Sequence, residues 1–248
     1  MTQNELFRCF AILALVSIAL PSRAAQSDNP VTPFSAAQPG AQLPKGWIAL
    51  RFGANKQPTE YRFVQEGRQV VLHARAVAAT GALLHPVNFD VRGAPLLRWR
   101  WKISQVIAEA DNAIASKEDS PARIVLGFDG DQSRLTAKDR TASALAKRAT
   151  GRALPYAQLI YIWSTKAPVG SVIQHPHSQR VKMIVAVSGP ANAGKWVTLS
   201  RNVYDDFKRA FGEEPGALTD VGVLTDSDNT GASVEAWYGD IRFAPAKP

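Results

Sequence analysis

Apolar and polar side chains alternate over many short runs of this chain. The clearest run is Leu96–Ile103, where Trp99 and Trp101 alternate with Arg98 and Arg100. Alternation with a period of two is typical of a β-strand that buries one face and exposes the other. Two tryptophans at this spacing can form a platform for sugars, but their Leu and Ile neighbours favour a place in the core.

The same pattern predicts a series of further strands and two helices. The strands are expected at Trp47–Phe52, Tyr61–Gln65, Gln69–Ala76, Leu83–Phe89, Arg123–Asp129, Gln158–Trp163, Val181–Val187, Trp196–Ser200, Leu218–Thr225 and Val234–Phe243. A helix is expected within residues 133–150, where Thr136 and Asp139 have capping-box spacing, and a second from Asn202 to Gly212. We therefore predict a mainly β fold, an antiparallel two-sheet sandwich (a jelly roll resembling a carbohydrate-binding module) with two helical insertions.

The stretch Leu218–Phe243 contains the densest group of oxygen ligands in the chain. A turn with Asp226, Asp228 and Asn229 separates its two predicted strands. We expect these strands to close the sandwich as a hairpin-like pair, with the carboxylates at one rim. Calcium prefers six to eight oxygen ligands, so the turn is a candidate calcium site. Aspartate and asparagine also favour turns for backbone reasons alone, and that alternative stays open.

The N-terminus has the pattern of a secretory signal peptide. Arg8 precedes an apolar run, Cys9–Leu20, and small residues end it at Ala24. A run of about a dozen residues is shorter than the roughly 20 that span a bilayer. We expect residues 1–24 to be a signal peptide, 25–44 a Pro-rich linker and 45–245 a single β-sandwich domain. The mature protein is then periplasmic or secreted, with no transmembrane segment.

Charge and cysteine content narrow the classes of partner. The chain has 29 Lys and Arg against 21 Asp and Glu, a formal charge of +8 that falls to +7 once residues 1–24 are removed. This surplus favours anionic ligands of the envelope. Nucleic acid is not expected, because the predicted export of the protein argues against it. The single cysteine, Cys9, leaves with the signal, so no disulfide is expected.

Several clusters along the chain resemble the bacterial domain-of-unknown-function family 3047 of exported proteins, over about residues 45–243. The matching segments are Leu97–Lys102, Lys117–Arg123, Leu159–Trp163, Arg201–Phe207, Phe211–Pro215, Thr225–Thr230 and Trp237–Ile241. The family often has paired aspartates before its Pro-Ala-Arg element, whereas here Asp119 is followed by Ser120. The resemblance implies no activity. The closing strand, Tyr238–Phe243, is also similar to the last strand of galactose-binding-like jelly rolls in carbohydrate-binding modules.

These observations predict a non-catalytic protein that binds a glycan or another polar or anionic ligand of the envelope. The candidate ligand-binding residues are Arg98, Arg100, Asp119, Arg123, Tyr161, Trp163 and Tyr238. No nucleophile elbow, phosphate loop or zinc motif is present in the sequence. Two alternatives remain: a hydrolase of envelope carbohydrate that uses rim carboxylates as acid and base, and an assembly factor whose basic helix meets another protein.

Overall fold

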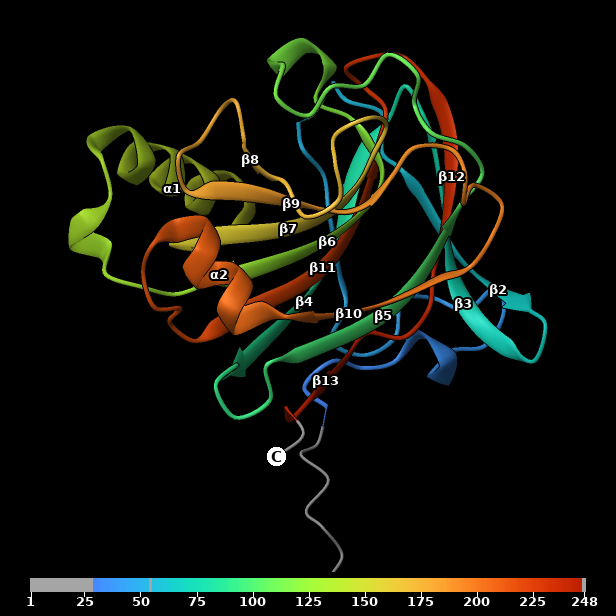
Figure 1. The fold of residues 1–248 in the computed structure, drawn as a ribbon, viewed down its shortest axis with the longest axis horizontal. Coiled ribbons are helices and arrows are strands. Elements are labelled where there is room, and N and C mark those ends of the chain that lie inside the picture. The colour runs from blue at the N-terminus through green and yellow to red at the C-terminus, as the bar shows by residue number, and fades with distance from the viewer. Residues whose placement is uncertain (1–28, 54, 247–248) are drawn as a thin grey trace, which may run out of the picture.

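The computed structural model describes residues 29–53 and 55–246, which form two β-sheets packed face to face (Figure 1). The seven-stranded sheet has the order β1 (Ile48–Leu50), β4 (Thr80–Phe89), β11 (Leu218–Asp226), β6 (Ser120–Phe128), β7 (Ala157–Ser164), β9 (Val181–Ser188) and β8 (Val172–Gln174). The six-stranded sheet has the order β10 (Val197–Asn202), β5 (Leu96–Ile103), β12 (Ser233–Tyr238), β3 (Gln69–Val77) and β2 (Glu60–Glu66), and β13 (Arg242–Ala244) also pairs with β5.

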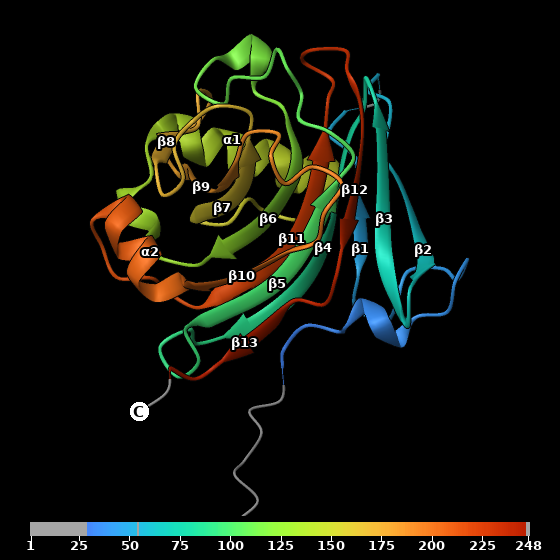
Figure 2. The ribbon, with the colours of Figure 1, turned by 45° about the vertical axis from the view of Figure 1, so that its right-hand side comes forward.

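The chain passes repeatedly from one sheet to the other, as in a jelly roll, and this confirms the predicted fold class. Strands β3, β5 and β12 belong to one sheet, and β4, β6 and β11 to the other (Figure 2). The pairing is antiparallel except between β7 and β9, which run parallel. The short strand β8, which follows Pro168 and Gly170, was not predicted because three residues are too few for a periodic pattern.

The main core lies between the sheets and is built from the inward residues of the alternating strands. Trp99 and Trp101 are 2% and 0% exposed, and their rings pack edge to face at 5.4 Å. The core interpretation of this pair is confirmed. Arg98, on the same strand, is exposed on the outer face, as the alternation requires.

The expected hairpin-like closure at residues 218–243 is wrong. Strand β11 belongs to the seven-stranded sheet and β12 to the six-stranded sheet, so the turn between them crosses the sandwich. The second predicted strand is also divided into β12 and β13. It breaks at Gly239, where a Cβ atom would come within 2.6 Å of the Arg100 side chain that lies across it.

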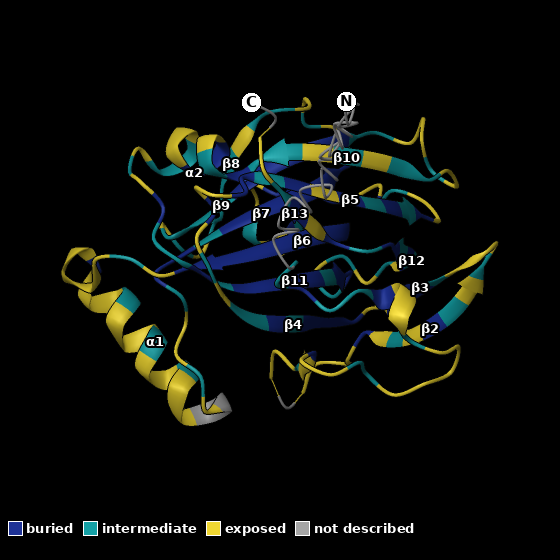
Figure 3. Ribbon diagram, turned by 90° about the horizontal axis from the view of Figure 1, so that it is seen from below, coloured by how far each residue is buried: buried dark blue, intermediate teal, exposed yellow. Residues whose placement is uncertain are grey.

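Both helices begin and end as the sequence predicts. Helix α1 (Ala137–Thr150) starts with a capping box between Thr136 and Asp139, and Gly151 ends it in the left-handed conformation. Asn202 caps α2 (Val203–Phe211), which buries Phe207 against Phe128. The three-residue 3₁₀ helices are η1 (Phe34–Ala36), η2 (Ala115–Lys117) and η3 (Gln132–Arg134). None of residues 137–148 of α1 is buried, and the helix stands apart from the sheet strands in Figure 3.

Part of the predicted Pro-rich linker packs onto the sandwich. Val31 and Phe34 are each 1% exposed, and the Phe34 ring lies 4.6 Å from that of Trp47. Ser35 donates from its backbone N and its hydroxyl to the Asp240 carboxylate. The stretch is extended around η1, but its two apolar side chains enter the core, so it is not a free linker at these positions. The predicted signal peptide lies outside the described residues.

Among the described residues, no helix is long and apolar enough to cross a membrane.

A second apolar cluster covers the outer face of the seven-stranded sheet. It consists of Val125, Ile160, Ile162, Met183 and Val185, which point away from the main core. The central strands are therefore buried on both faces, and β6 is buried at all nine positions (Figure 3). The candidate site lies on this outer face of the sheet, which is apolar and partly covered.

Candidate functional site

A groove of about 470 Å³ runs over the outer face of the seven-stranded sheet. Its floor is made of aligned residues from neighbouring strands. The register places Leu84 of β4, Gly222 of β11, Val125 of β6 and Ile160 of β7 opposite one another. Gly222 is required here, because a Cβ atom would lie 2.3 Å from Leu84 and 2.8 Å from the Leu83 carbonyl oxygen. The middle of the groove floor is therefore aliphatic, and no side chain projects from it at Gly222.

At one end of the groove a buried ion cluster interrupts the apolar floor. Arg123 donates from Nε and Nη2 to the two carboxylate oxygens of Asp226, each at 3.1 Å. Its Nη1 donates to Glu118 Oε1 at 2.6 Å, and His175 Nε2 lies 3.4 Å from Glu118 Oε2. The side chains of Arg123, Asp226 and Glu118 are 2%, 8% and 10% exposed. All four residues line the groove.

The two carboxylates of the cluster have different proton affinities. Burial raises the pKa of Asp226 to about 7; Arg123 opposes the rise, and the nearby charges of Glu118 and Asp119 add to it. Burial alone would also raise the pKa of Glu118, but Arg123 and His175 outweigh it and lower that pKa to about 2. Near neutral pH Glu118 is therefore ionised, and Asp226 is the carboxyl group that can change its protonation.

The opposite end of the groove is polar as well. Asp220 of β11 accepts a hydrogen bond from Arg152, which follows α1. The strand register places Asp220 opposite Gly127 of β6, and Gly127 opposite Gln158 of β7. Arg51 also lines the groove and lies in the loop that follows the edge strand β1. The groove therefore has an aliphatic middle and charged groups at its ends and edge.

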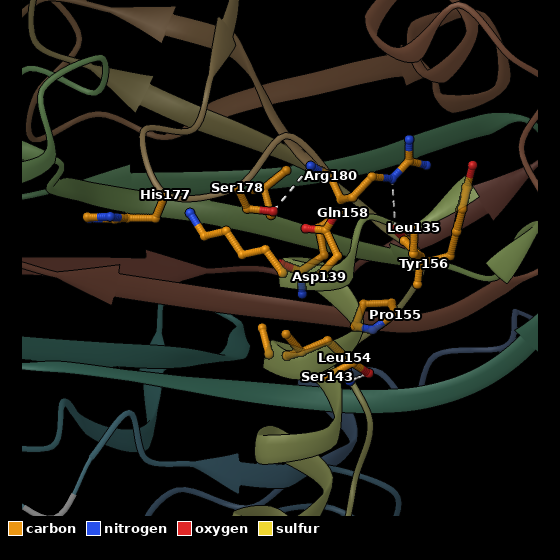
Figure 4. Close-up of a pocket in the computed structure, with 13 residues that line it drawn as sticks. Leu135, Asp139, Ser143, Leu154, Pro155, Tyr156, Gln158, His177, Ser178 and Arg180 are labelled. Carbon is orange, nitrogen blue, oxygen red and sulfur yellow. Dashed lines mark hydrogen bonds between the residues drawn. The ribbon is translucent and has the colours of Figure 1, made fainter. Parts of the chain in front are cut away.

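Helix α1 and the segment after it form part of the roof. Ala146 lines the groove, and Ala142 and Ser143 line a smaller side pocket that shares Leu154 and Pro155 with it. Figure 4 shows this side pocket, where Arg180 donates to the Tyr156 carbonyl oxygen. The small side chains of α1 leave the space between helix and sheet open.

Two of the predicted ligand-binding residues lie in this region. Arg123 lines the groove and forms its buried cluster. Asp119 is 1% exposed, and its carboxylate accepts from the backbone N atoms of Asn229 and Thr230 and from the Thr230 hydroxyl. Asp119 therefore closes the aspartate-rich turn and does not line the groove.

The three predicted aromatic ligands, Tyr161, Trp163 and Tyr238, are 0% exposed between the sheets, which corrects their predicted role. Their polar atoms have protein partners. Tyr161 donates to Asp206 at 2.8 Å, and the Tyr238 hydroxyl donates to the Leu224 carbonyl oxygen at 2.9 Å. These aromatic side chains support the sheets from inside and are inaccessible to an external ligand.

Arg98 and Arg100 lie on the outer face of the other sheet, so the structure does not bring them near Arg123. The Arg100 guanidinium stacks over Trp196 at 4.3 Å and donates to Gln69. In this sheet β12 lies between β3 and β5. Trp237 of β12 stands between His73, stacked at 4.8 Å, and Lys102, at 4.3 Å.

The predicted metal residues are only partly brought together. Carboxylate oxygens of Asp226, Asp228 and Asp119 all lie within 4.8 Å of one another, close enough to share one ion. Protein donors already contact each of them, since Lys56 donates to Asp228 at 2.5 Å and Arg123 to Asp226. The Asn229 side chain instead donates to the Ala115 carbonyl oxygen. A calcium ion here would replace the Lys56 contact, and calcium binding stays a prediction.

Sequence reasoning missed Glu118, His175 and Arg51 as site residues. No acidic cluster lies near His175 in the sequence, so nothing there indicates its contact with Glu118. A usable signal was present in β6, β7 and β9, which have apolar residues such as Val125, Ile160 and Val185 at outward positions as well as at inward ones. Such strands predict a covered outer face. They do not reveal which loop residues converge on it.

A family model described as protein of unknown function (DUF3047) matches residues 45–242. The chain belongs to this family. No functionally curated protein matches it. The match agrees with the family resemblance of the motifs and supplies no activity.

Several solved structures match this chain at low similarity. A bacteriophage CBA120 tailspike protein 4 domain is 9% identical, with a TM-score of 0.42, and the match covers 88% of this chain but only 21% of that one. The Emp47p carbohydrate recognition domain is 12% identical, with a TM-score of 0.43 and coverage of 89% and 96%. A cellulose-specific carbohydrate-binding module, CBM28, is 12% identical, with a TM-score of 0.37 and coverage of 81% and 87%.

Proposed function

We propose that the protein is an exported, non-catalytic binding module whose groove holds a glycan or another polar or anionic ligand of the cell envelope. The observation that carries the proposal is the convergence of Arg123, Glu118, Asp226 and His175 on one end of the groove. Small-molecule sites are commonly apolar hollows of roughly 300–1,000 Å³ with a few convergent polar groups. Export rests on the sequence pattern of residues 1–24.

The contacts within the cluster favour binding over catalysis. Each oxygen of Asp226 accepts from Arg123, and Asp226 Oδ1 also accepts from the Ser120 backbone N. Glu118 is held between Arg123 and His175. Carboxylates fixed in this way keep their geometry when a ligand arrives, and a pre-ordered set of polar groups lowers the entropic cost of binding.

The experiment is calorimetric titration of the mature chain with a panel of envelope glycans, including acidic ones. Ala146→Trp should fill the groove from α1 and weaken binding at least tenfold. Ala144→Trp is the matched control, because Ala144 is exposed on the same helix and does not line the groove. Equal binding by both variants would place the ligand elsewhere and defeat the proposal.

A hydrolase is the second candidate function, favoured by the divergent pKa values of Glu118 and Asp226. Two carboxyl groups whose environments push their pKa values apart are typical of acid and base pairs. If the groove is catalytic, Asp226→Asn should abolish turnover of a polysaccharide that the wild type cleaves. Asp228→Asn should leave turnover intact, since Asp228 faces Lys56 and does not line the groove. Binding without turnover in the wild type would exclude this candidate.

A further inference from the structure

The aliphatic floor of the groove indicates the class of its ligand. We propose that the groove holds a single-chain anionic amphiphile, with its aliphatic chain along the floor and a carboxylate or phosphate head at Arg51. This inference rests on the proposed function, because it names the ligand class of the same site.

The floor offers a surface for an alkyl chain but not for a sugar ring. Leu84, Val125, Ile160 and Leu224 line its centre, and Gly222 lies between Leu84 and Val125 in the register. Branched aliphatic side chains give an uneven apolar surface that a flexible chain can follow. Among the described residues that line the groove there is no Tyr or Trp, and the one Phe is Phe52, which is 47% exposed in the edge loop. The flat platform on which a sugar ring would stack is thus missing from the floor.

The roof leaves room for such a chain and keeps water from one side of it. Ala146 lines the groove from α1, and Ala153, Leu154 and Pro155 follow in the segment after the helix. Leu154 is 49% exposed. An apolar surface of this kind gains free energy when an alkyl chain removes it from water. The chemistry of roof and floor therefore points to one type of occupant.

The charges of the groove indicate an anionic head group. Arg123 is neutralised by Glu118 and Asp226, and Arg152 is paired with Asp220. Arg51 also lines the groove, and it has no ion pair with any residue in the described part of the chain. It is exposed at the edge of the sheet, where a head group can stay hydrated while the chain enters. A guanidinium binds carboxylate and phosphate oxygens in a bidentate manner.

The test titrates the mature chain with decanoate and decyl phosphate below their critical micelle concentrations and with decanol below its solubility limit, beside the glycan panel. We expect both anions to bind and decanol to bind at least tenfold more weakly. Ala146→Trp should weaken anion binding at least tenfold, and Ala144→Trp should not change it. Arg51→Gln should weaken anion binding several-fold without affecting decanol, whereas Arg98→Gln, on the opposite sheet, should have no effect. A preference between decanoate and decyl phosphate identifies the head group.

The outcomes separate this inference from the function on which it rests. One outcome is that a glycan binds the wild type and Ala146→Trp weakens its binding, while neither decanoate nor decyl phosphate binds. This outcome would support the proposed binding function and overturn the proposal of an amphiphilic ligand. Decanol binding as tightly as decanoate would overturn the role of Arg51. Binding of every probe unchanged by Ala146→Trp, or no binding at all, would overturn both.

Discussion

Arg123 and Asp226 form a two-pronged ion pair from neighbouring strands, with both N–O distances at 3.1 Å and both side chains almost fully buried. The pair holds β6 against β11 at the end of the groove and places the Glu118 contact beside it. It links the stability of the sandwich to the geometry of the site.

Arg123→Ala should therefore destabilise the protein by about 3–5 kcal/mol, because it leaves two buried carboxylates without their cation. Urea denaturation monitored by tryptophan fluorescence measures this change. Arg62→Ala is the matched control, since Arg62 forms an exposed pair with Glu60; such pairs contribute about 0–1 kcal/mol. Equal losses in both variants would contradict the structural role of Arg123.

The two buried carboxyl groups, Asp226 and Glu118, should together contribute most to stability near pH 4. The pKa of Asp226 is raised from 3.8 to about 7. Its contribution to the free energy of unfolding is therefore fully present below pH 4 and is lost as the pH rises to 7. The pKa of Glu118 is lowered from 4.5 to about 2, so its contribution is present above pH 4.5 and is lost as the pH falls toward 2. One proton changes stability by at most about 1.4 kcal/mol per pH unit.

Denaturation curves from pH 3 to pH 8 test this dependence. Asp226→Asn cannot ionise, so it should remove the decline between pH 4 and pH 7 and keep the loss at lower pH. Asp228→Asn should retain both limbs. If the difference in stability between the wild type and Asp226→Asn does not change from pH 4 to pH 7, the pKa of Asp226 is not raised in the folded state.

Local patterns in the sequence predicted those features that depend on neighbouring residues. The alternation of Leu96–Ile103 assigned Trp99 to the core, and the spacing of Thr136 and Asp139 placed the start of α1. These features follow from pleat and hydrogen bonding within a few residues.

The sequence could not show which strands are neighbours or which apolar face is the inner one. Both faces of β7 are apolar, so Tyr161 and Ile160 are indistinguishable by pattern, although the first lies in the core and the second lines the groove. The hairpin prediction failed because strands adjacent in sequence, β11 and β12, pair within different sheets. The Arg123 cluster depends on this long-range order, since His175 and Glu118 are 57 residues apart.

Calcium should raise the melting temperature of the protein if the carboxylates of Asp119, Asp226 and Asp228 share an ion. A ligand at 100 times its Kd stabilises the folded state by about 2.7 kcal/mol. Differential scanning fluorimetry with calcium or with a chelator measures the shift, and Asp228→Asn should abolish it. An unchanged melting curve would remove the metal interpretation and leave Asp119 as the group that closes the turn.

Replacing both Arg98 and Arg100 with Ala should leave ligand binding in the groove unchanged, because these residues lie on the opposite sheet. The variant should lose only a small amount of stability, about 0.5–1 kcal/mol, from the stacking of Arg100 on Trp196. Titration with the ligand identified for the groove provides the measurement. Loss of binding would instead assign a role to the outer face of the six-stranded sheet, as the sequence predicted.

The packing of Val31 and Phe34 affects how the protein should be cut for expression. The family match begins at residue 45, but these two side chains, which precede it, fill part of the interior beside Trp47. Ser35 also donates hydrogen bonds to Asp240, which lies just before the last strand, β13. A recombinant fragment that starts at residue 45 would have a cavity beside Trp47 and would lack the hydrogen bonds from Ser35 to Asp240. A fragment meant to fold should therefore start before Asn29.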